Sequence, residues 1–123
     1  MINLKSLAII LFFIMFIYSG FNKINGFYKK VSILQAKTHL PFFINVLGMI
    51  GVILLEIFGS LVMILYFIDN YMINKYLVKT TNILFLAFLI IVTFLYHPPT
   101  DKLIPFLSNM TTFAGLLYIY ADL

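Results

Sequence analysis

Four long apolar runs follow one another along the chain, and short polar stretches separate them. Each run has about the 20 residues that an α-helix needs to cross roughly 30 Å of hydrocarbon. The pattern predicts an all-α protein, a bundle of four transmembrane helices formed by residues 1–123 as a single integral membrane domain. The predicted spans are residues 4–22, 42–68, 77–96 and 103–121.

Polar and helix-breaking residues separate the predicted spans. Pro41 suits the first turn of the second span, because its missing N–H removes no helical hydrogen bond there. The pair Pro98-Pro99 ends the third span, since consecutive prolines cannot supply the amides that a helix needs. An even number of spans puts both chain ends on one face of the membrane, and the connections 24–40 and 97–103 on the other.

The connection between the first two spans carries a helical pattern of its own. Phe27, Val31 and Leu34 have the i, i+4, i+7 spacing of one helix face, while the three lysines of this segment lie elsewhere around the helix. The pattern predicts a short amphipathic segment in the membrane interface between the first and second helices. An ordinary lysine-rich loop is the alternative.

The composition agrees with a membrane location. Hydrophobic residues make up 63% of the chain and charged residues only 10%, and the mean hydropathy is +1.10. A water-soluble domain of this size could not bury that much apolar surface. We therefore predict a multi-pass membrane protein that has the lipid bilayer as its surroundings; which membrane holds it, and in which orientation, is left open.

Residue types that are absent exclude several functions. There is no cysteine, which excludes disulfides, thiolate nucleophiles, Cys-ligated metals and the CxxC-bearing quinone enzymes. The net charge of +4 comes from eight lysines that lie mostly between the apolar runs, where membrane orientation and lipid headgroups explain them better than a nucleic acid does. His39 and His97 are the only histidines, so we predict neither a haem nor another metal site.

Glu56 is the residue that most requires an explanation, because it lies near the middle of the second predicted span. A carboxylate at that depth costs about 2.5 to 3.5 kcal/mol on insertion scales. We therefore expect Glu56 to face the bundle, to be protonated or to be paired. A functional role and a structural ion pair are both open at this stage.

Three further polar residues lie toward the same membrane face and complete a candidate intramembrane polar cluster: Lys23, His97 and Asn109. At 1.5 Å per residue, Glu56 lies about 20 Å from the start of its own span. A direct contact between Glu56 and Lys23 would therefore need a tilted helix or a bridging water, and we do not predict one. No catalytic residue is predicted.

Glycines mark the expected places of close helix packing. Missing side chains let two backbones approach each other, as small residues do in many membrane bundles. Gly48, Gly51 and Gly59 make the second span the candidate for the centre of the bundle, and Gly115 is the corresponding residue of the fourth.

Several short motifs resemble the DoxX-like family of small four-helix membrane proteins, over nearly the whole chain. They are Ser19-Gly20-Phe21-Asn22-Lys23, Leu40-Pro41, Glu56-Ile57-Phe58-Gly59, His97, and Asn109 followed by Ala114-Gly115-Leu116-Leu117. The resemblance implies a membrane subunit associated with quinone-linked sulfur or thiol oxidation, or an adaptor that holds soluble redox enzymes at the membrane. It also implies that Lys23, Glu56 and Asn109 are the polar positions that matter. The arginine that relatives carry near the N-terminus of the first span has no counterpart here.

Three functional hypotheses follow. The first is a membrane subunit or scaffold without catalytic activity of its own, which holds partner proteins or assembles as a homo-oligomer; a structural protein in the membrane of a virus particle is one version. The second is a subunit of a quinone-linked redox complex, in which Glu56 relays protons and Lys23 or His97 lies near the quinone headgroup. The third is a small transporter or lipid-binding bundle, because intramembrane carboxylates often mark pathways.

Overall fold

The computed structural model describes residues 3–69, 73–96 and 103–123, and these residues form helices and no strand. The predicted all-α class is confirmed. A π-helical turn, labelled η1, interrupts the second long helix without ending it. The elements in chain order are α1 (Leu4–Ile24), α2 (Phe27–Thr38), α3 (Phe42–Leu54), η1 (Leu55–Gly59), α4 (Ser60–Ile68), α5 (Lys75–Tyr96) and α6 (Leu103–Ala121).

Among the described residues, four helices are long and apolar enough to cross a membrane: Leu4–Ile24, Phe42–Ile68, Lys75–Tyr96 and Leu103–Ala121. The four predicted spans agree with these helices to within about two residues at each end. No more than 33% of the most apolar stretch of any span is buried within the protein. Most of the surface of each span is therefore apolar and faces outward, as expected where lipid is the solvent.

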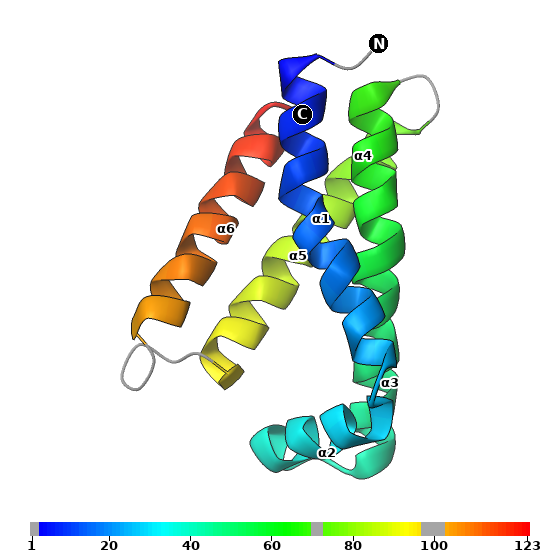
Figure 1. Cartoon of the computed structure of the whole chain (residues 1–123), viewed down its shortest axis with the longest axis vertical. Coiled ribbons are helices and arrows are strands. Elements are labelled where there is room, and N and C mark those ends of the chain that lie inside the picture. The colour runs from blue at the N-terminus through cyan, green and yellow to red at the C-terminus, as the bar shows by residue number, and fades with distance from the viewer. Residues whose placement is uncertain (1–2, 70–72, 97–102) are drawn as a thin grey trace. The chain divides into compact units, whose positions relative to one another are not determined.

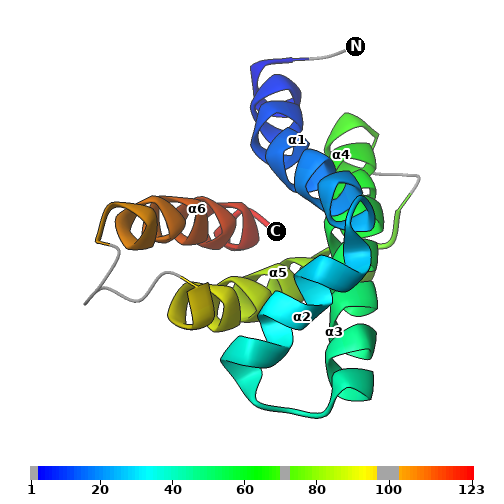
Figure 2. The same ribbon diagram turned by 60° about the horizontal axis from the view of Figure 1, so that its bottom comes forward.

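The chain divides into two compact units, Met1–Val78 and Lys79–Leu123. In the first unit, α1 lies alongside the continuous rod formed by α3, η1 and α4, and α2 crosses the end of the pair (Figures 1 and 2). In the second unit, α6 turns back from the end of α5. The edge-to-face rings of Phe94 and Phe106, whose centroids lie 6.2 Å apart, join these two helices close to their connection.

The N-terminal end of α1 is fastened to the end of α4. The Asn3 side chain accepts a hydrogen bond of 2.8 Å from the backbone amide of Ser6, which satisfies one of the free amides of the first turn. The buried Ser6 hydroxyl donates a hydrogen bond of 2.9 Å to the carbonyl oxygen of Phe67. The ammonium of Lys5 lies 5.3 Å from the centre of the Phe67 ring, within the range of a cation–π interaction.

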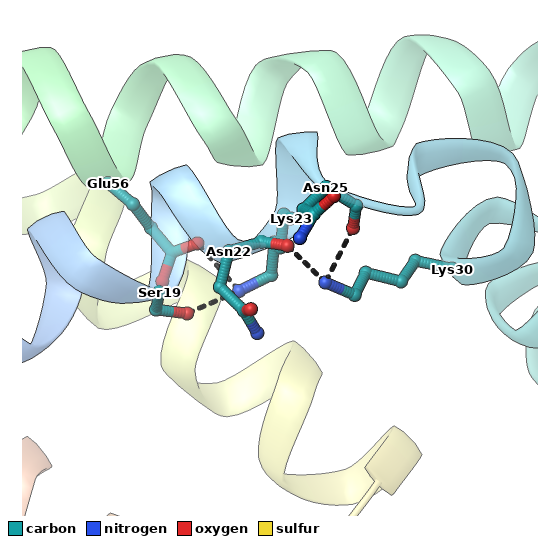
Figure 3. Close-up of polar contacts among 6 residues, drawn as sticks. All are labelled: Ser19, Asn22, Lys23, Asn25, Lys30 and Glu56. Carbon is teal, nitrogen blue, oxygen red and sulfur yellow. Dashed lines mark hydrogen bonds and ion pairs between the residues drawn. The ribbon is translucent and has the colours of Figure 1, made fainter.

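A sharp corner joins α1 to α2. Gly26 has a φ of 68°, a left-handed conformation that costs glycine little. The ammonium of Lys30 donates hydrogen bonds to the carbonyl oxygens of Asn22 and Asn25, at the C-terminal end of α1 (Figure 3). The end of a helix leaves carbonyls without partners and carries partial negative charge, so a lysine is well suited there.

The connection between the first two spans is a helix, as the spacing of its apolar residues predicts, and not an irregular loop. Val31 is fully buried, and α2 packs against α3. At the second corner, buried Asn45 donates from its amide to the carbonyl oxygens of Leu40 (3.0 Å) and Pro41 (3.1 Å) and accepts from the hydroxyl of Thr38 (2.7 Å). Hydrogen bonds at both corners thus fix the direction of α2.

Candidate functional site

An ion pair joins α1 to the π-helical turn. The ammonium nitrogen of Lys23 lies 2.7 Å from the Glu56 carboxylate and donates a second hydrogen bond, of 2.6 Å, to the hydroxyl of Ser19 (Figure 3). Ser19 and Lys23 are four residues apart, so they lie on the same face of α1. The three side chains form the polar site of the first unit.

The two charged partners differ in burial. The side chain of Glu56 is 3% exposed and that of Lys23 is 25% exposed. A buried carboxylate without a partner would lose its hydration and gain nothing in return, whereas a charge-assisted hydrogen bond at 2.7 Å offsets much of that cost. Part of the Lys23 side chain therefore remains exposed.

Several buried residues of the α3–η1–α4 rod lie in or next to the π-helical turn. Glu56, Ile57 and Gly59 lie within the turn and Ser60 follows it directly, and all four are buried. A π turn takes one additional residue and so turns the following side chains around the axis. Turns of this kind occur frequently at functional sites. No residue in the sequence marks its position.

Gly20 allows the close approach that forms the pair. A Cβ at this position would lie 2.6 Å from Cγ1 of Ile57 and 3.2 Å from Cβ of Glu56, so only glycine fits without displacing its neighbours. Gly20 precedes Lys23 by one helical turn. The approach of α1 to η1 at Gly20 therefore brings Ser19 and Lys23 within reach of the carboxylate.

The close contact is thus at a glycine that the packing prediction did not include. Gly48 and Gly51 are exposed, and in the part of the chain that the structure describes no atom lies within 4 Å of where their Cβ atoms would be. Gly59 is buried at the end of the π turn. A packing role for Gly115, which is half-buried in α6, remains a prediction.

The direct contact between Lys23 and Glu56 differs from the sequence-based expectation. That expectation placed the end of α1 level with the start of the second span. In the structure α1 instead ends beside η1, and α3 continues past it and packs against α2. Lys23 therefore reaches Glu56 directly, and no bridging water is needed.

The other two members of the predicted polar cluster are not part of this contact. Asn109 belongs to the second unit, where its amide donates a hydrogen bond of 3.1 Å to the hydroxyl of Thr93; that hydroxyl donates one of 2.6 Å to the carbonyl oxygen of Leu89. His97 lies outside the described residues. The structure thus brings together Lys23 and Glu56 and gives Asn109 a different partner.

Two buried polar side chains were not predicted as site residues. The hydroxyl of Ser60 and both amide atoms of Asn82 are buried and make no hydrogen bond within the described ranges. Asn82 could have been found by the signal that identified Glu56, a polar residue in the middle of an apolar span. Among the described residues, no group of three His, Asp or Glu side chains could hold a metal ion.

Comparison with known proteins leaves the family open. No family model, no curated protein and no solved structure matches this chain. The resemblance to DoxX-like proteins therefore remains a prediction that depends on short motifs. Two of the three polar residues that the resemblance singles out, Lys23 and Glu56, are in contact in the structure.

We expect the hydrogen bond between Asn109 and Thr93 to contribute modestly to stability. A double-mutant cycle of Asn109→Ala and Thr93→Ala should give a coupling of about 0.6 kcal/mol, the average for such bonds within membranes. The measurement is reversible unfolding of the purified protein in mixed micelles. Thr112→Ala, which removes only a bond to the carbonyl of its own helix, is the matched control and should show no coupling to Asn109→Ala. A coupling near zero for the first cycle would contradict the contact.

Proposed function

We propose that this chain is an integral membrane subunit or scaffold, of the DoxX-like type, that holds partner proteins at a membrane and has no catalytic activity of its own. The observation that carries the proposal is the ion pair of Lys23 and Glu56. The Glu56 carboxylate lies 2.7 Å from the Lys23 ammonium, next to the close contact at Gly20. An ion pair in such a place suits the role of holding two helices together. A carboxylate that relays protons must instead gain and release them during turnover.

The apolar surface of the spans is a second argument for the proposed role. Apart from the one that contains α2, the connections between the spans are short. The spans expose large apolar side chains, among them Phe43, Phe58 and Phe94. Such surfaces suit lipid and the transmembrane helices of other subunits. Partners would therefore be bound within the membrane or by the short connections.

Native purification tests this proposal. The protein, carrying an affinity tag at its normal expression level, is extracted in a mild detergent and its mass is measured by light scattering. The proposal expects a complex with another protein in fixed stoichiometry. An unrelated four-span protein with the same tag is the control for detergent-dependent association. A monomer, or an oligomer of this chain alone, would contradict the proposed role. The identity of a partner would also show whether the assembly is a virus particle.

A quinone-binding redox subunit is the second candidate, and one observation favours it. The side chain of Lys23 is partly exposed beside a buried carboxylate, so its ammonium could donate a hydrogen bond to the carbonyl oxygen of a quinone headgroup. Solvent extraction of the same purified sample distinguishes the two candidates. Quinone in stoichiometric amount, lost in Lys23→Met, would favour the redox subunit. Its absence would favour the scaffold.

A further inference from the structure

We propose that α2 is a membrane-surface helix that binds the phosphate groups of anionic lipids. The inference requires that the chain spans a bilayer and is independent of the proposed scaffold role. It starts from the direction of α2, which crosses the end of the pair formed by α1 and the α3–η1–α4 rod (Figures 1 and 2). When the long helices cross a membrane, a helix in this position lies along its surface.

Hydrogen bonds at both ends of α2 hold the helix in this direction. At its N-terminal corner, Lys30 binds the last carbonyls of α1 (Figure 3). At its C-terminal corner, Asn45 binds the carbonyl oxygens of Leu40 and Pro41. A helix that is fixed before lipid binds loses little conformational freedom on binding, so even weak contacts with headgroups are retained.

The outer face of α2 has the side chains of an interfacial helix. Ile33 is 45% exposed on the side of the helix away from buried Val31, and Tyr28, which lies nearer to the Val31 side, is 71% exposed. Lys29 is also exposed. At a membrane surface the apolar groups would enter the boundary between headgroups and acyl chains, while the lysine stem extends toward the phosphates.

The charge of this region favours anionic lipids over neutral ones. Residues 1–55 contain five lysines and no Asp or Glu, since the four acidic residues of the chain are Glu56, Asp69, Asp101 and Asp122. Glu56 is paired with Lys23. The three lysines within α2, at positions 29, 30 and 37, thus lie in a part of the sequence that is basic throughout. Basic residues near an anionic membrane surface attract its lipid headgroups.

The test compares lipid preference between variants that change charge at opposite ends of the first unit. The protein is reconstituted in phosphatidylcholine bilayers with a trace of spin-labelled phosphatidylglycerol or spin-labelled phosphatidylcholine. The motionally restricted fraction of each label gives its relative association with the protein. The proposal expects wild type to prefer phosphatidylglycerol about threefold or more at low salt. In Lys29→Gln/Lys37→Gln this preference should fall close to one.

Two further variants make the result decisive. Lys5→Gln/Lys75→Gln removes the same charge from the other end of the unit and should keep the wild-type preference, and Lys29→Arg/Lys37→Arg should keep it because the charge is conserved. The proposal is overturned if wild type shows no preference, if the Lys29/Lys37 glutamine variant retains it, or if the Lys5/Lys75 variant loses it. Gel filtration of each variant in detergent confirms that the proteins compared are folded.

Discussion

Replacing Lys23 with methionine is expected to lower the free energy of unfolding by about 3 to 5 kcal/mol, the usual cost of removing one partner of a buried ion pair. The variant leaves the Glu56 carboxylate, which is 3% exposed, without its cation. Glu56→Met should cost less, because the Lys23 side chain it leaves behind is 25% exposed and can turn its ammonium outward. Reversible unfolding in mixed micelles, followed by circular dichroism, gives both values.

The double variant Lys23→Met/Glu56→Met separates the ion pair from ordinary packing. Because it replaces both charges with apolar side chains, it should be more stable than the sum of the two single changes predicts, by about 1.5 kcal/mol or more. Lys29→Met is the control for loss of a lysine that does not contact Glu56. If the two single changes were additive, the ion pair would contribute nothing to the stability of the protein.

The second large effect is expected at Gly20. A Cβ there would lie 2.6 Å from Cγ1 of Ile57, so Gly20→Ala must push α1 away from η1 or force Ile57 out of its position. Overpacking of this kind costs about 1 to 3 kcal/mol, although the better helix propensity of alanine recovers up to about 1 kcal/mol. The unfolding measurement described for Lys23 applies here too.

Two variants show whether the close contact is the cause. Ile57→Ala removes Cγ1, so it should be less damaging in the Gly20→Ala background than in wild type. Gly51→Ala is the matched control, because no atom lies within 4 Å of the added Cβ in the described part of the chain. Equal losses of stability for Gly20→Ala and Gly51→Ala would contradict the close contact of α1 with η1.

The spans and the helix between the first two were predictable because few physical solutions exist. A run of about 20 apolar residues in lipid must satisfy its own backbone hydrogen bonds, and a helix does so within one segment. The spacing of Phe27, Val31 and Leu34 predicts a helix with one buried face, and Val31 is its buried residue in the structure. These predictions depend only on local sequence.

The site was predictable only in part because it depends on how helices meet. A carboxylate in an apolar span identifies Glu56 as a residue that needs a partner. The partner of Glu56 could not be assigned, because the distance along one helix, calculated from the rise per residue, does not show where a neighbouring helix ends. The π turn at residues 55–59 has no signal in composition, and the role of Gly20 depends on the position of Ile57. Contacts between helices determine both features.

The separation of Lys23 and Glu56 in the sequence has a consequence for biosynthesis. The two residues are 33 positions apart, and ribosomes add about 5 to 20 residues per second. Lys23 therefore emerges about two to seven seconds before its counter-ion. During this interval the ammonium is best hydrated at the level of the headgroups, so we expect the first span to reach its final depth only when the second span enters the bilayer beside it. The two helices would then mature as a hairpin, before the third span enters the bilayer.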